Sequence, residues 1–179
     1  LSGLIIISSI LFTKKSLYDC FDKTKSTFDK NDFYKICIDF PRDDLIKKID
    51  LPIINMPKEV YNHTIKRCKI NSAIGLLATE GTLKTGIYNK FFDKKYNLVF
   101  PNSKIQKNYV NQAIKFVKMG NVKAASKIIK PAIDYLINKK CKKIILGCTE
   151  LPIAIFAFKS FNKIKTSKLF LDPNLILAN

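Results

Sequence analysis

Two short apolar runs, each followed at once by small polar residues and then by a helical pattern, constrain this fold more than any other feature. Ala73–Ala78 reads AIGLLA, and Lys143–Gly147 reads KIILG. A continuous apolar run of this length is typical of a strand buried inside a parallel sheet. Helical patterns lie between and after the two runs. This alternation predicts an α/β fold built on a parallel sheet.

The remaining chain continues the alternation. Further strands are predicted at 33–38, 51–55, 97–100 and 169–171, and helices at 17–30, 43–49, 82–92, 107–118, 122–138 and 151–161. Gly120 ends the 107–118 helix, and Pro131 predicts a kink inside the strongly amphipathic segment 122–138. The apolar run Leu1–Phe12 is shorter than the ~20 residues of a membrane span, so it is predicted to be a buried strand.

The net charge of +18 first suggests a nucleic-acid partner, but its composition argues against one. Of the 32 cationic side chains only Arg42 and Arg67 are arginines, the residue type best suited to bidentate contacts with bases and phosphates. The lysines are scattered along the chain as separate pairs. We therefore predict a lysine-covered, solvated surface with neither a nucleic-acid partner nor a membrane partner.

The chain has five cysteines and one histidine, His63. No two cysteines have the C-x-x-C spacing of a structural zinc site, and a single histidine cannot complete one, so no metal is predicted. An odd number of cysteines without a secretory signal favours reduced thiols and a cytoplasmic location.

Both apolar runs end in residues suited to binding an anion. Cys148, Thr149 and Glu150 follow the second run, at the predicted start of a helix. Helix N–H groups there would lower the pKa of the thiol, Thr149 could bind a carboxylate, and Glu150 could orient an ammonium. Thr79 and Thr82 flank a glycine after the first run, as in a small anion cradle. Taken singly, a buried cysteine and a helix cap explain these features equally well.

Taken together, the segments GLLATEGT…GIY (75–88) and GCTELP (147–152) resemble the aspartate/glutamate racemase family, whose members need no cofactor. Three further pieces match in the same order, namely LPIINM (51–56), VKMGN (117–121) and LDPNLILA (171–178). The resemblance runs from about Asp32 to the C-terminus. It implies two pseudo-symmetric parallel-sheet lobes with the active site between them.

In that scheme, residues 1–72 form a partial first lobe with a C-terminal return at about 169–179, and residues 73–168 form the second lobe. The family begins with a strand and a glycine-rich loop, and Leu1–Phe12 shows neither the loop nor more than one glycine. The first lobe is therefore expected to be incomplete.

The resemblance implies racemisation by two cysteines, one removing the α-proton from one face and the other returning it on the opposite face. Cys148 matches the second family cysteine. Cys37 is the candidate for the first, although the proline, asparagine and threonine that normally surround it are missing. Thr79, Thr82 and Thr149 match positions suited to the substrate carboxylate. Lys118 matches a position where a cation can hold the side-chain carboxylate of aspartate or glutamate.

The implied partner is a small amino-acid substrate. Because members of the resembled family often form dimers, a homodimer is also expected. Two alternatives remain open at this point. The chain is either an active racemase or an inactive remnant of the family, and the same cysteines also serve related isomerases and decarboxylases.

Overall fold

The computed structural model describes residues 4–7, 10–13, 55–162 and 168–178, and these belong to two compact units, Leu1–Met56 and Pro57–Asn179. The elements predicted at 17–30, 33–38 and 43–49 lie outside the described residues, as does nearly all of the strand predicted at 51–55. Cys37 lies outside them as well. The division into lobes at residue 72 stays a prediction.

In the first unit, β1 (Leu4–Ile7) and β2 (Ile10–Thr13) pair as antiparallel strands. Their register pairs Leu4 with Thr13 and Ile7 with Ile10, which leaves two residues between the strands. That is the commonest connection length of a β-hairpin. The sequence predicts one strand over this apolar run, and the structure instead divides it into two.

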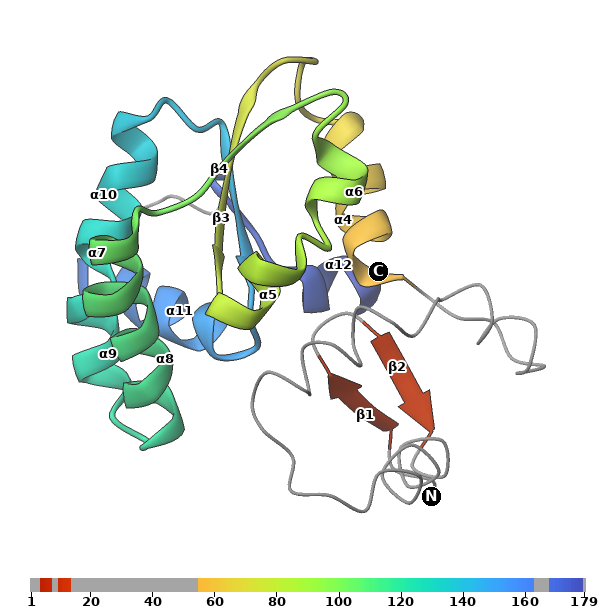
Figure 1. Cartoon of the computed structure of the whole chain (residues 1–179). Helices are drawn as coiled ribbons and strands as arrows, with labels where there is room; N and C mark the ends of the chain where they lie inside the picture. The colour runs from red at the N-terminus through yellow and green to blue at the C-terminus, as the bar shows by residue number, and fades with distance from the viewer. Residues whose placement is uncertain (1–3, 8–9, 14–54, 163–167, 179) are drawn as a thin grey trace. The chain divides into compact units, whose positions relative to one another are not determined.

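The second unit is built on a four-stranded sheet (Figure 1). Its strands are β3 (Ala73–Ala78), β4 (Asn97–Val99), β5 (Lys143–Gly147) and β6 (Phe170–Leu171). All neighbours are parallel and the order is β4-β3-β5-β6. The predicted α/β fold is confirmed, and β3 and β5 have the predicted bounds. Gly75 allows close packing, because a Cβ there would lie 2.9 Å from Leu136 Cδ1.

The segment after β3 forms two short helices instead of the single helix predicted at 82–92. These are α5 (Glu80–Thr85) and α6 (Asn89–Phe92). Gly86 separates them, because its φ of 58° is left-handed and its N–H caps the carbonyl of Leu83. The sequence prediction missed this glycine as a helix end.

The helical segment after β4 contains a π turn. It consists of α7 (Ser103–Ile105), the π-helix η1 (Gln106–Val110) and α8 (Asn111–Lys118). Gly120 follows α8 with a φ of 76°, as its predicted role requires. The amphipathic segment is broken into α9 (Val122–Ile128) and α10 (Lys130–Asn138), and Pro131 lies in the first turn of α10. The predicted kink is therefore a helix boundary.

The remaining helices are α11 (Glu150–Asn162), which the sequence predicts, and two that it does not, α4 (Met56–Ile65) and α12 (Pro173–Ala178). Figure 1 shows α8, α9 and α10 on one side of the sheet and α4 and α6 on the other. The first side encloses a cluster of buried aliphatic side chains that includes Leu77, Ile144 and Leu146. On the second side, Tyr61 of α4 packs edge-to-face on Phe92, with a centroid distance of 5.4 Å.

Candidate active site

The strand order places a topological switch point between β3 and β5. From β3 the chain passes first to β4 on one side of it and then to β5 on the other, so the two crossovers leave in opposite directions. In open parallel sheets, ligands bind outside the carboxyl ends of the strands at such a switch point. The last residues of the two strands, Ala78 and Gly147, are direct partners in the ladder. The residues that follow them therefore start side by side.

The carboxyl end of β5 carries a compact set of polar side chains around one carboxylate. The Sγ of Cys148 donates to Glu150 Oε2 at 2.8 Å, and Thr149 Oγ1 donates to the same oxygen at 3.0 Å. The ammonium of Lys118 lies 3.5 Å from the other oxygen, Oε1. The Glu150 side chain is 19% exposed and that of Lys118 is 64% exposed, so the carboxylate is covered and its cation is in solvent.

This arrangement fixes the protonation states of the thiol and the carboxylate. Burial raises the pKa of Cys148 to about 12, and the hydrogen bond to Glu150 adds to the shift. Burial alone would also raise the pKa of Glu150, but the hydrogen bonds from Cys148 and Thr149 and the charge of Lys118 bring it below its ordinary value. Cys148 is thus a neutral thiol that donates to an ionised carboxylate.

The position of Cys148 at the start of α11 predicts a lowered thiol pKa, and that prediction is wrong, because burial and the hydrogen bond to Glu150 both raise it. The partial positive charge of a helix N-terminus is weak beside a full negative charge at hydrogen-bond distance. Glu150 is the first residue of α11 and lies only two positions after Cys148. Its carboxylate favours the protonated sulfur.

The threonine pair that follows β3 is neutral and internally bonded. Thr79 is the N-cap of α5, and its Oγ1 accepts from the Thr82 N–H at 3.2 Å. The two hydroxyl oxygens lie 3.0 Å apart, which is a hydrogen bond in either direction. Thr82 is 5% exposed. The pair can offer one hydroxyl hydrogen outward, because only one is used between them.

The structure therefore gathers three of the predicted residues, Cys148, Thr149 and Lys118, around the carboxylate of a fourth, Glu150. It places Thr79 and Thr82 together at the neighbouring strand end. Their functional roles stay predictions, and Cys37 is outside the described residues.

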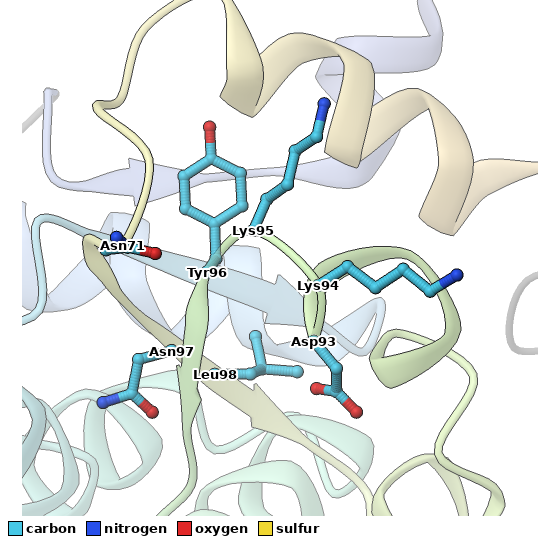
Figure 2. Close-up of a pocket in the computed structure, with 7 residues that line it drawn as sticks. All are labelled: Asn71, Asp93, Lys94, Lys95, Tyr96, Asn97 and Leu98. Atoms are coloured by element: carbon cyan, nitrogen blue, oxygen red, sulfur yellow. The ribbon is translucent and has the colours of Figure 1, made fainter.

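A separate cavity of about 390 Å³ lies at the opposite edge of the sheet, where Asn71 precedes β3 and Asn97 begins β4. Figure 2 shows that the charged groups of Asp93, Lys94 and Lys95 point in three different directions. Side chains that diverge in this way cannot bind one small ligand together, so this cavity is not a candidate for the predicted site.

Within residues 55–162 and 168–178 and the short strands before them, no helix is long and apolar enough to cross a membrane. In the same residues no three histidine, cysteine, aspartate or glutamate side chains are grouped closely enough to hold a metal ion.

Residues 41–179 match the family model described as Asp/Glu/Hydantoin racemase. The chain belongs to this family. Its strand-end motifs and its parallel sheet are therefore those of a racemase relative, as the motif resemblance predicts.

Individual relatives agree with this assignment. The chain is 26% identical to the glutamate racemase of Persephonella marina over 61% of this chain and 40% of that protein. It is 28% identical to the glutamate racemase of Oceanobacillus iheyensis over 64% and 41%, respectively. It is also 35% identical, over 46% and 55%, to a Pectobacterium carotovorum protein encoded next to pnlA. The chain spans about half the length of the curated relatives it matches.

Solved structures show the same fold. The aspartate racemase of Picrophilus torridus matches with a TM-score of 0.53 and 27% identity, over 70% of this chain and 50% of that one. An aspartate racemase homologue from Pyrococcus horikoshii matches with a TM-score of 0.58 and 24% identity, over 75% and 56%.

Sequence reasoning missed three residues next to the site, Gln106, Asn111 and Glu80, which are joined by hydrogen bonds beside Thr79. The helix was predicted to begin at Lys107, one residue after Gln106. The available signal was Asn102, which caps α7 by accepting from the Ile105 N–H at 2.9 Å and so starts the helical segment earlier.

Proposed function

We propose that this protein racemises an acidic amino acid, aspartate or glutamate, without a cofactor, and that Cys148 is one of its two acid/base cysteines. The observation that supports this proposal best is the position of Cys148 at the switch point of the sheet. It follows β5 directly, carries a proton and donates to the Glu150 carboxylate, which also pairs with Lys118, and β5 pairs with the strand that ends before Thr79. Family membership supports racemisation in general.

The protonation states suggest how the thiol works. A substrate α-carbon that has lost its proton to a base on one face can take the Cys148 proton on the other, leaving a thiolate on Sγ. In the reverse direction, that thiolate removes the α-proton and becomes a thiol again. Cys37 is the proposed partner on the opposite face. Each direction uses one base and one acid, so no proton is gained or lost overall.

The thiolate form needs help, because Glu150 favours the protonated sulfur. An incoming substrate supplies that help through its ammonium group, which can pair with Glu150. Pairing would weaken both the hydrogen bond and the charge repulsion that hold the proton on Cys148. Substrate binding would thereby lower the thiol pKa at the moment a base is needed.

The other polar groups suit the two carboxylates of such a substrate. The α-carboxylate, whose charge grows as the carbanion forms, would accept the one outward hydroxyl hydrogen of the Thr79–Thr82 pair, and that of Thr149 once it turns from Glu150. Lys118 is the donor proposed for the side-chain carboxylate. Its exposed ammonium already lies beside this site. Because the chemistry requires reduced thiols, we also propose a reducing compartment such as the cytoplasm.

The test is exchange of the substrate α-hydrogen in deuterated water, followed by NMR with each enantiomer of aspartate and of glutamate. The full chain is expected to exchange both enantiomers of one of these acids. Cys148→Ser should lower exchange by about 10²-fold or more, the usual size of an acid/base contribution. Cys141→Ser is the matched control, because Cys141 is buried in the aliphatic cluster. Absence of exchange from every enantiomer would contradict the proposal and favour an inactive remnant.

A further inference from the structure

A line of side-chain hydrogen bonds holds Thr79 from both sides. The amide nitrogen of Gln106 donates to the carbonyl of Ala78 at 2.9 Å. The amide nitrogen of Asn111 donates to Glu80 Oε1 at 2.6 Å. Ala78 and Glu80 are the residues immediately before and after Thr79. Two side chains of the helical segment 103–118 therefore hydrogen-bond to the residues on each side of Thr79, which caps α5. We call Gln106 and Asn111 with these bonds the clamp.

The π turn allows Gln106 and Asn111 to make these two hydrogen bonds from the same face of the helix. Gln106 Nε2 also donates to Asn111 Oδ1 at 2.8 Å, which ties the two amides together. In an α-helix, residues five apart point about 140° away from each other around the axis. In η1 the Asn111 N–H bonds to the Gln106 carbonyl, the five-residue spacing of a π-helix, so the two side chains share a face.

The direction of every bond in this line is determined. The Ala78 carbonyl and the Glu80 carboxylate can only accept, so an amide nitrogen must face each of them. Asn111 then presents its oxygen to Gln106, whose second amide hydrogen fills it. Gln106 is 4% exposed, and among the described residues its Oε1 is the buried side-chain atom that has no partner.

An unpartnered buried oxygen is destabilising, and an apolar side chain at position 106 would avoid it. The glutamine is therefore poorly explained by packing. Its two donated bonds explain it better, since a side chain without donors could not hold both Ala78 and Asn111. π turns inside α-helices are frequent at functional sites.

We propose that Gln106 and Asn111 are positioning residues that fix Thr79, and through it Thr82, for the substrate carboxylate. This inference rests on the proposed function. Thr79 transmits the constraint because its Oγ1 accepts the Thr82 N–H and contacts the Thr82 hydroxyl. With the clamp intact, the hydroxyl pair is held in its binding arrangement before a ligand arrives, which lowers the entropic cost of binding.

The first test measures hydrogen exchange of the Thr82 amide by NMR in the full chain, without ligand. Gln106→Met keeps the length of the side chain but removes both donors. Thr82 exchange is expected to be about tenfold faster, as for the loss of one hydrogen bond. Asn102→Ala is the matched control, because it removes a cap of the same helical segment without touching the clamp. In Asn102→Ala, the Thr82 amide should exchange at the same rate as in the unchanged chain, after correction for any difference in global stability.

A second pair of variants serves if Gln106→Met does not fold. Glu80 is exposed, so neither Glu80→Ala nor Glu80→Gln disturbs the core. Glu80→Gln keeps an oxygen that can accept from Asn111, and its Thr82 exchange and aspartate or glutamate affinity should match those of the unchanged chain. Glu80→Ala should speed Thr82 exchange and weaken the affinity by several fold. Equal behaviour of the two Glu80 variants, or of Gln106→Met and Asn102→Ala, would overturn the clamp.

The two proposals fail separately. If the unchanged chain neither binds nor exchanges either amino acid, the proposed function fails. The Thr82 amide measurements still decide whether the clamp exists, since they need no ligand.

Discussion

The two strand ends at the switch point, those of β3 and β5, differ in how their polar groups are held. At the end of β3, the threonine pair is neutral, and the Gln106–Asn111 clamp fixes it from outside. At the end of β5, three donors converge on the single carboxylate of Glu150, and one of them is an exposed lysine. The first end is held in one arrangement by hydrogen bonds. The second end contains a thiol and a carboxylate whose pKa values depend on each other.

This contrast predicts that only the β5 end responds strongly to pH. The folded-state pKa of Cys148 is raised from 9.0 to about 12, so the folded chain keeps a proton that the unfolded chain releases above pH 9. Stability from this group is complete below pH 9 and is lost as pH rises toward 12. We expect this to be the largest effect: the unchanged chain should lose stability more steeply than Cys148→Ser between pH 9 and 12, measured by urea unfolding.

Glu150→Gln sharpens the same prediction. Without the negative charge, the thiol pKa should fall from about 12, while burial keeps it above 9.0. The rate of thiol alkylation against pH, corrected with Cys148→Ser for the other cysteines, reports this pKa. An unchanged alkylation profile in Glu150→Gln would mean that burial alone sets the pKa of Cys148 and that the Glu150 carboxylate does not affect it.

A substitution at Gly147 tests how closely the ends of β3 and β5 pack together. A Cβ on Gly147 would lie 3.0 Å from Leu76 Cδ1 and 3.2 Å from Ala78 Cβ. Gly147→Val should therefore force β3 and β5 apart and destabilise the fold by about 2–3 kcal/mol, as overpacking does. Urea unfolding measures the loss. Thr149→Val, an exposed neighbour, is the control and should change stability by less than about 0.5 kcal/mol. Wild-type stability in Gly147→Val would contradict the tight pairing.

The ends of β3 and β5 also show which parts of the fold and of the candidate site the sequence predicts. Apolar runs predict β3 and β5 to the residue, because buried parallel strands carry their signal in consecutive positions. Cys148, Thr149 and Lys118, which lie in segments that match family motifs, contact Glu150, and their roles stay predictions. Each is close to a strand or helix end that the sequence marks.

The missed features depend on contacts between distant segments. The Gln106 clamp joins residues 28 positions apart, and the π turn that allows it has no pattern of its own. The sequence predicts the thiol pKa in the wrong direction, because a helix N-terminus is visible in sequence whereas the burial of Cys148 and the rotamer that points Glu150 at it are not. The sequence does not predict α4, because its buried face is narrow. That face consists of Pro57, Val60 and Thr64, and polar or charged residues fill most of the other positions.

A smaller effect is expected from removing the cap at the β3 end. Thr79→Ala deletes the acceptor of the Thr82 N–H and half of the hydroxyl pair. Loss of an N-cap costs about 1 kcal/mol. Thermal unfolding should show this loss equally at pH 6 and pH 9, because no titrating group is involved. A pH-dependent loss would mean that the two strand ends are electrostatically coupled. Asn121→Ala, which removes the cap of α9, is the matched control.

The smallest effect on stability is expected from Lys118, and it separates binding from folding. Its ammonium is 64% exposed and 3.5 Å from Glu150, so the pair contributes little to stability in water. Lys118→Met should change the free energy of unfolding by less than about 0.5 kcal/mol. If the lysine holds the substrate side-chain carboxylate, the same variant should weaken binding of aspartate or glutamate about tenfold or more, measured by calorimetry. Lys115→Met, on the exposed face of the same helix, should change neither quantity. Equal affinities for Lys118→Met and Lys115→Met would remove Lys118 from the binding site and leave it as a partner of Glu150 alone.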